Sequence, residues 1–389
     1  MADPSIIEHI LDQGRWAPSG DNTQPWRFQI SGESAVVIHG FDTRAHCVYD
    51  LDGHPSQLSL GALIETISIA ASAHGLKVIA TRRLDVPDTQ PTFDLQFVMQ
   101  PGLAADPLGV HIRSRSVQRR PMSLRPLSAA EKKVLEASVG SGFSLNWLEG
   151  FSARQRAARL MFANAKLRLT MPEAYQVHRD IIEWDAQFSQ DRVPVQALGI
   201  DPITARLMRH VLGSWERVKF FNTYLAGTLV PRLQMDLLPG FFCAAHFVLL
   251  AGRRAQGIDD YVSAGRALQR FWLTASSLGL QMQPELTPLI FARYVREQVR
   301  FTAEPGLNDT ARALVSGLDS LIGTRGAELA VFMGRIGAGP AARSRSTRQA
   351  LGKLMWPGTP DTSGTPGTSG TPGTPGTPST PSTPGIPGT

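Results

Sequence analysis

The stretch Arg15-Trp-Ala-Pro-Ser-Gly-Asp-Asn-Thr-Gln-Pro-Trp-Arg-Phe28 carries the strongest local signals in the chain. It predicts a helix that stops before Pro18, a tight polar turn, and a strand that begins at Trp26, because the residue before a proline avoids the helical region. The backbone N–H groups, hydroxyls and amides of such a turn can bind the polar edge of a planar heterocycle or an anion. An ordinary helix-to-strand connection explains the same residues at least as well.

Regular elements are expected on both sides of this turn. The preceding helix has an apolar stripe over residues 6–11, with Asp3 as its cap and Pro4 in its first turn. Strands are expected over residues 26–30, 35–39, 77–82 and 93–100, and a helix closed by Gly75 is expected over residues 58–74.

A second segment of the chain repeats part of this pattern. Residues 61–76 align with residues 265–280: each segment runs between two glycines, ends in Gly-Leu and has Ala-Ser shortly before that pair. Small residues at fixed helical spacing allow helices to pack closely. The pattern favours a tandem duplication, and a chance match between two amphipathic helices is the alternative.

The chain divides into a first half over residues 1–110 and a second half over residues 111–356, with a helical insertion at about residues 153–239. The insertion is interpreted either as a core of helical hairpins or as a lid over a pocket. Its aromatic residues are Tyr175, Trp184, Phe188, Trp215, Phe220, Phe221 and Tyr224. Residues 357–389 consist almost entirely of Gly, Thr, Pro and Ser, which predicts a disordered, solvated tail.

Composition points to a soluble globular protein, since 42% of the residues are hydrophobic and 19% are charged. No apolar run approaches the roughly 20 residues of a membrane helix, and the N-terminus lacks the pattern of a signal peptide. Cys47 and Cys243 lie too far apart in sequence for a CxxC motif. We therefore expect a cytoplasmic protein without a membrane partner.

The net charge of +6 results from 39 basic and 33 acidic residues. Two arginine clusters suit either a compact phosphate ligand or ordinary solvated charge. They comprise Arg113, Arg115, Arg119 and Arg120, then Arg343, Arg345 and Arg348. No nucleic-acid-binding motif accompanies them, so no nucleic-acid partner is expected.

Other catalytic motifs find little support. Residues 334–339 have the order GxxGxG, not the dinucleotide-binding order GxGxxG. The nine histidines show no HxxxH or HExxH spacing, so no metal site is predicted, and single histidines such as His178 and His246 are interpreted as structural. The sequence also contains no GxSxG nucleophile elbow.

The stretch that includes Ala17 to Trp26 resembles the Ala-Pro-Ser-x-x-Asn-x-Gln-Pro-Trp signature of the nitroreductase family, FMN-dependent oxidoreductases with an α+β fold. Arg115-Ser-Val-Gln-Arg119 is similar to a second family signature, an Arg-Ser-x-x-Arg-like segment before a helix. Residues 265–285 resemble the family's long central helix and the following flavin-side loop. Residues 329–337 and 345–348 resemble its last strand and phosphate-binding basic residues. The resemblance covers about residues 4–352.

Each signature occurs once, whereas an ordinary family member dimerises to build its flavin sites. The counterpart of the first turn, residues 137–147, has lost the proline and the Gln-Pro pair. This arrangement resembles fused, double-length nitroreductase-like proteins. It implies a nitroreductase-like fold duplicated in one chain as a pseudo-dimer with one FMN, and a monomer or weak homodimer in solution.

The resemblance also implies roles for individual residues. Pro18, Ser19, Gly20 and Asn22 would line the isoalloxazine edge, and Glu285 would lie near flavin N5 through its loop backbone. Arg115, Ser116 and Arg119 would bind the pyrimidine edge or phosphate, with Arg345 and Arg348 on the phosphate. No catalytic side chain is predicted, because flavin N5 itself accepts and passes on hydride.

The implied activity is a ping-pong reaction in which NADH or NADPH reduces the flavin, and a small organic acceptor of unknown identity then takes the electrons. One alternative is a flavin-binding or flavin-sequestering protein with little turnover. Another is a degenerate structural or partner-binding relative that holds no flavin.

Overall fold

The computed structural model describes residues 5–357 of the chain. The expected cap at Asp3 and all but the first residue of the predicted tail lie outside these residues. Helix α1, Ile6–Gly14, is capped by Ser5, whose hydroxyl accepts from the backbone N–H of Glu8 while the Glu8 carboxylate accepts from the N–H of Ser5. The cap is therefore Ser5 and not Asp3, because this reciprocal capping box satisfies two N–H groups at the helix start.

The first half forms a four-stranded antiparallel sheet in the order β1-β2-β4-β3. Its elements after α1 are β1 Trp26–Ser31, β2 Ala35–Gly40, α2 His54–Ser72, β3 Leu76–Arg82 and β4 Thr92–Met99. The four predicted strands are confirmed. Helix α2 begins four residues earlier than predicted, at His54, after Gly53 with its left-handed φ of 77°.

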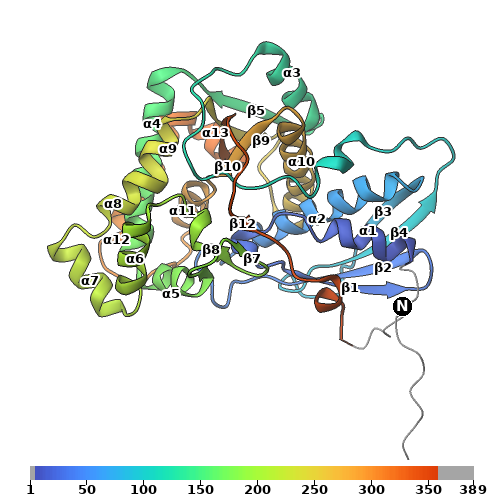
Figure 1. Cartoon of the computed structure of the whole chain (residues 1–389), viewed down its shortest axis with the longest axis horizontal. Helices are drawn as coiled ribbons and strands as arrows, with labels where there is room; N and C mark the ends of the chain where they lie inside the picture. The colour runs from blue at the N-terminus through green and yellow to red at the C-terminus, as the bar shows by residue number, and fades with distance from the viewer. Residues whose placement is uncertain (1–4, 358–389) are drawn as a thin grey trace, which may run out of the picture.

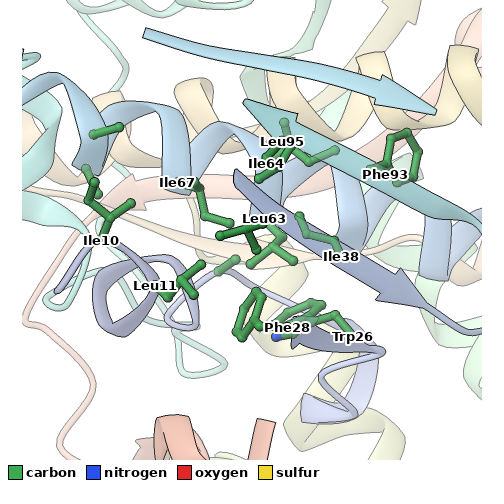
Figure 2. Close-up of a cluster of buried hydrophobic side chains, with 14 of the residues drawn as sticks. Ile10, Leu11, Trp26, Phe28, Ile38, Leu63, Ile64, Ile67, Phe93 and Leu95 are labelled. Carbon is green, nitrogen blue, oxygen red and sulfur yellow. The ribbon is translucent and has the colours of Figure 1, made fainter. Parts of the chain in front are cut away.

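Side chains from α1, α2 and the sheet form the core of the first half (Figure 2). Trp26 and Phe28 on β1 are fully buried against Leu11 of α1 and Leu63 of α2. Burial of each such side chain contributes about 1.5–3 kcal/mol. The strand that leaves the polar turn is thereby fixed to both helices.

The second half has a sheet of the same order, β5-β9-β11-β10, again fully antiparallel. Its helix α3 also begins with a capping box, between Ser128 and Glu131. Its elements are α3 Ala129–Ser138, β5 Phe143–Leu148, β9 Ala245–Ala251, α10 Gly257–Ser277, β10 Leu280–Pro284 and β11 Ala330–Ala338. In chain order, each element corresponds to one of the first half.

Helices α2 and α10 cross at Gly61 and Gly265, the glycines that the sequence comparison aligned. A Cβ on Gly61 would lie 2.0 Å from the Val262 carbonyl oxygen, and a Cβ on Gly265 would lie 2.0 Å from that of Leu58. Val262 and Leu58 each precede the glycine of their own helix by three residues. The contact is therefore reciprocal, and it brings the two backbones closer than any side chain would allow.

The halves differ in two connections. Residues 32–34 link β1 to β2, whereas residues 149–244 link β5 to β9, so the insertion extends a few residues beyond its predicted ends. Its helices lie at the left of Figure 1, and its short strands β7 and β8 lie in the centre of the view. It contains α4 Gly150–Leu169, α5 Pro172–Ile181, β6 Ile182–Glu183, β7 Phe188–Ser189, β8 Val193–Pro194, α6 Pro202–Val211, α7 Trp215–Tyr224, α8 Leu229–Arg232, the π-helical turn Leu233–Leu237 and α9 Leu238–Phe241.

A second insertion, which the sequence analysis did not predict, links β10 to β11. Residues 285–329 hold α11 Thr287–Arg296, α12 Leu307–Ile322 and α13 Thr324–Leu329, whereas the equivalent β3–β4 connection spans residues 83–91. Among the described residues, no helix has both the length and the apolar character needed to cross a bilayer.

After β11 the chain returns to the first half, as Figure 1 shows in orange and red. On the way, β12 Arg345–Ser346 pairs in parallel with β7 of the insertion. The backbone N–H of Trp356 then donates to the Phe28 carbonyl at 2.7 Å, and the Trp356 ring stacks on His39 at 3.9 Å. This C-terminal segment, residues 339–357, therefore carries Arg345 and Arg348 to the N-terminal turn.

Candidate functional site

A cavity of about 930 Å³ lies where the two halves, the insertion and the C-terminal segment meet. This volume is at the upper end of the range of small-molecule pockets, about 300–1,000 Å³. Every predicted cofactor-binding residue except Glu285 lines it: Pro18, Ser19, Gly20, Asn22, Arg115, Ser116, Arg119, Arg345 and Arg348. Folding thus brings together three segments that are far apart in sequence.

The polar turn is held in an unusual backbone conformation. Asp21, Asn22 and Gln24 have positive φ angles of 49°, 64° and 49°, which cost energy in residues other than glycine and cluster at ligand clamps. The Gln24 amide donates to the carbonyls of Asn22 and Gln190, and its oxygen accepts from the N–H of Gln349. The insertion and the C-terminal segment thus both fix the turn.

Asn22 is the most buried side chain of this turn that faces the cavity. Its Nδ2 donates to the Arg192 carbonyl at 3.3 Å, while its Oδ1 is buried without a hydrogen-bond partner. A buried acceptor left unsatisfied costs about 1–3 kcal/mol, so a ligand N–H would find a prepared partner here.

Arg115, Arg345 and Arg348 form an arginine cluster in the cavity wall. Within the described part of the chain, none of the three forms an ion pair with a carboxylate. Arg115 donates to the Trp16 carbonyl and lies 4.4 Å from the Trp272 ring centroid, and its Nε is buried without a partner. An anion would supply the missing acceptor.

The electrostatics of the arginine cluster favour the same ligand. Burial lowers the pKa of Arg115 well below its usual value, and the positive charges of Arg348 and Arg345 lower it further. Burial, followed by the charges of Arg345 and Arg15, lowers the pKa of Arg348 to about 9. Bound negative charge would relieve this desolvation and repulsion.

Arg119 lies in the same wall, and burial lowers its pKa to about 10 although Asp21 acts in the other direction. The Arg119 carbonyl accepts from Arg335 Nη2 at 2.9 Å, and Arg335 Nη1 pairs with Glu285 at 2.9 Å. The backbone N–H of Glu285 donates to the Met333 carbonyl, so it is engaged in the second sheet. Glu285 therefore supports Arg119 from behind the wall. It does not itself line the cavity, whereas Pro284 and Leu286 on either side of it do, so its place near the flavin through the loop backbone stays a prediction.

The insertion supplies a mainly aliphatic wall. Of its seven aromatic residues named above, only Tyr175 and Phe221 line the cavity. The aliphatic residues that do so include Ile182, Val193, Leu198, Leu207, Met208, Val211, Leu212, Val218, Leu225, Val230 and Met235. This part of the cavity suits an apolar or planar substrate.

Several polar residues that were not predicted from the sequence also line the cavity, among them Tyr49, Arg168, His178 and Asp236. Tyr49 Oη and His178 Nε2 are 2.9 Å apart, and Arg168 Nη2 donates to Asp236 Oδ1 at 3.2 Å. They come from four separate segments, so no local motif could have found them. Residues 5–357 contain no group of three or more His, Cys, Asp or Glu side chains placed to hold a metal ion.

No protein-family model and no curated protein matches the chain. Among solved structures, the chain is similar to the crystal structure of a nitroreductase-like family protein from Bacillus cereus, with 12% sequence identity and a TM-score of 0.33. The match covers 64% of this chain and 95% of that one. A likeness at this level carries no argument about function, which depends on the geometry of the chain itself.

Proposed function

We propose that the protein is an FMN-dependent oxidoreductase of nitroreductase-like fold, which passes electrons from NADH or NADPH to a small organic acceptor. The observation that carries the proposal is the convergence, in one cavity, of the polar turn, the segment from Arg115 to Arg119 and the C-terminal arginines. The same segments carry the resemblance to the nitroreductase family in the sequence.

The charge and the apolar surfaces of the cavity support FMN as its ligand. Arg115, Arg345 and Arg348 would hold the phosphate, and each charge-assisted hydrogen bond would contribute about 1.5–3 kcal/mol. Leu58 and Ala62 of α2, with Leu268 and Trp272 of α10, provide an apolar surface for a planar ring. Asn22 Oδ1 would accept a hydrogen bond from the polar edge of that ring.

When bound, FMN supplies hydride transfer to and from the substrates. The chain positions the reactants, since the turn would orient the polar edge of the flavin ring. Arg119 adds positive charge, which favours the reduced flavin because that form carries more negative charge. The aliphatic wall of the insertion excludes water. Because donor and acceptor would share this cavity, the donor must leave before the acceptor enters, which gives ping-pong kinetics.

The proposal includes a tandem duplication that places a pseudo-dimer in one chain. Three features support it: the shared strand order, the capping box on the first helix of each half, and the reciprocal contact of Gly61 with Gly265. The polar turn belongs to the first half alone, so one FMN site per chain follows. The insertion then acts as a lid over that single site.

A flavin-sequestering protein with little turnover is the second candidate. It is favoured by the hydrogen bonds that tie the polar turn to the insertion, from Gln24 to Gln190 and from Asn22 to Arg192. A site clamped in this way would release FMN slowly and admit substrates poorly.

The absorbance spectrum of the purified protein, taken before and after anaerobic addition of NADPH, separates these candidates. An oxidoreductase should show a flavin spectrum that bleaches with NADPH and returns with an added acceptor. A flavin spectrum that NADPH leaves unchanged, with NADH tested in parallel, would favour sequestration. A colourless protein that takes up no added FMN would refute both.

A further inference from the structure

Three carboxylates line the cavity, those of Asp21, Asp201 and Asp236. The hydrogen bonding of Asp201 differs from that of Asp236. Asp201 caps α6: its Oδ1 accepts from the N–H groups of Ile203 and Thr204, and its Oδ2 accepts from the Thr204 hydroxyl and from the Gln234 amide. Its lone pairs are therefore engaged. Asp236 is 5% exposed, with Oδ1 bound to Arg168 and Oδ2 without any hydrogen-bond partner.

The backbone around Asp236 is also exceptional. Residue 236 lies in the π-helical turn Leu233–Leu237, between the short helices α8 and α9. Such turns insert one residue into a helix, change the direction of the side chains and occur frequently at functional sites. Here the turn places an incompletely satisfied carboxylate in the wall of a ligand-sized cavity.

Burial strengthens the hold of Asp236 on its proton, whereas most of the charged groups around it act in the opposite direction. Burial raises the pKa of Asp236 to about 6, although Arg168, Arg335 and Arg232 act to lower it, and Glu285 adds to the increase. These groups lie on α4, β11, α8 and the loop after β10.

The other polar groups of this wall are less suited to donate a proton. Burial, followed by the charge of Arg168, lowers the pKa of His178 to about 3, so its imidazole is neutral at pH 7. Burial raises the pKa of the Tyr49 hydroxyl well above its usual value, so it holds its proton. Asp21, whose pKa burial also raises, is the remaining competitor.

We propose that Asp236 is the proton donor to the acceptor in the oxidoreduction. This inference rests on the proposed function and extends it to acceptors with an oxygen that takes up a proton on reduction, such as quinones, which become hydroquinones, and nitro compounds, which lose that oxygen as water. Two-electron reduction takes up one hydride, drawn originally from NAD(P)H, and one proton. The carboxyl O–H bond breaks, the proton passes to the acceptor, and the electron pair stays on the carboxylate, which Arg168 stabilises until water restores the proton.

The test compares full-length wild type with Asp236→Asn, Asp236→Glu and Asp21→Asn. Asp309→Asn is the control, because its side chain is 80% exposed on α12. Flavin content and melting temperature establish that each variant is folded. Infrared spectra between pH 5 and 8 then follow the band of a protonated carboxyl group, which should titrate near pH 6 and be missing only from Asp236→Asn, with a shifted counterpart in Asp236→Glu.

Stopped-flow absorbance separates the two half-reactions, with NADPH as donor and 1,4-benzoquinone as acceptor. In Asp236→Asn, reduction by NADPH should proceed at the wild-type rate, while reoxidation by the quinone slows about 100-fold, the usual scale of general acid catalysis. The wild-type reoxidation rate should fall as pH rises through about 6, and that dependence should vanish in Asp236→Asn and return in Asp236→Glu.

Two results would overturn the donor role: an infrared titration that survives in Asp236→Asn, or an unchanged rate and pH profile of reoxidation. Loss of the pH dependence in Asp21→Asn alone would assign the role to Asp21. A protein that holds no FMN would refute the proposed function and the donor role together. Flavin content therefore distinguishes failure of the function from failure of this residue assignment.

Discussion

The two halves of the molecule have the same strand order, yet only one keeps the polar turn and only the other carries the long insertion. Between α1 and β1, residues 15–25 form the turn that faces the cavity, whereas residues 139–142 make a short loop between α3 and β5. Conversely, residues 32–34 close the first hairpin of the first half, and residues 149–244 replace that hairpin connection in the second. The candidate site therefore depends on the differences between two similar scaffolds.

The halves also differ in what their sheets bury. Strand β2 has Val36, Val37 and Ile38 in its centre, whereas β9 carries His246, which is fully buried. His246 contacts Glu285 Oε2 through Nδ1 at 2.6 Å and the Gly240 carbonyl through Nε2 at 2.7 Å. Since both partners are acceptors at neutral pH, both ring nitrogens donate and the imidazole is charged. The second half thus contains a buried ionic group that joins its sheet to the end of the insertion.

The largest expected effect concerns the contact that the halves share. Gly61→Ala and Gly265→Ala should each destabilise the protein by about 3 kcal/mol or more, because each methyl group would meet a backbone carbonyl of the other helix. The two losses should be similar, since the contact is reciprocal. Urea unfolding of both variants measures this, with Gly142→Ala as the control because no atom lies near its Cβ position. A large loss at one glycine only would break the proposed symmetry of the halves.

The second prediction tests whether the turn and the arginines serve one site. Wild type should bind one FMN per chain, and Arg119→Ala should weaken binding roughly 10- to 100-fold, about 1.5–3 kcal/mol. Asn22→Leu should weaken the same site without unfolding the protein. Flavin absorbance against protein mass gives the stoichiometry, and titration with FMN gives the affinity.

Arg120→Ala is the matched control for Arg119→Ala, because Arg120 is the next residue and does not line the cavity. Its FMN affinity should equal that of wild type. Two flavins per chain, or substitutions that each empty a different site, would contradict the complementary roles of the halves.

The third prediction concerns the buried ionic group of the second half. Burial acts to lower the pKa of His246, but the charge of Glu285 and the hydrogen bonds outweigh it and raise the pKa to about 10. The unfolded value is about 6.5, so the charged imidazole stabilises the fold fully below pH 6.5, and this contribution declines as pH rises toward 10. The urea midpoint should therefore fall between pH 6.5 and pH 9.

His246→Gln should lower stability at pH 6.5 and flatten that pH dependence. His39→Gln, on β2 of the first sheet, should leave the slope unchanged, because burial lowers the pKa of His39 and it is neutral over this range. An equal slope in wild type and His246→Gln would show that another group controls the alkaline stability.

The smallest effect is expected at the C-terminus. Deletion of residues 357–389 should leave the melting temperature and any activity unchanged, because that composition cannot bury a core. Trp356→Ala, just before the deleted residues, should cost about 0.5–1.5 kcal/mol through loss of its stacking on His39. A marked loss on deletion, measured by calorimetry, would show that the tail docks on the body.

Local sequence patterns identified much of this molecule correctly. The strands of the first sheet, the turn before Trp26 and the paired glycines of α2 and α10 were all predictable. Each depends on residues that are close together in sequence, where proline, glycine and the spacing of apolar residues restrict the backbone directly. The similarity of Gly61 and Gly265 was visible in the sequence, but the reciprocal contact between them was not.

Tertiary structure decided what reaches the cavity. The Glu285 carboxylate pairs with His246 and Arg335 behind the cavity wall, while its neighbours Pro284 and Leu286 line the cavity. No sequence pattern singled out Asp236, which lines the cavity because it lies in a π-helical turn. The sequence by itself determined the elements of the first half and which residues could bind an anion. Packing between distant segments determined which of those residues share a surface, because burial, charge and hydrogen bonding depend on neighbours that no local spacing specifies.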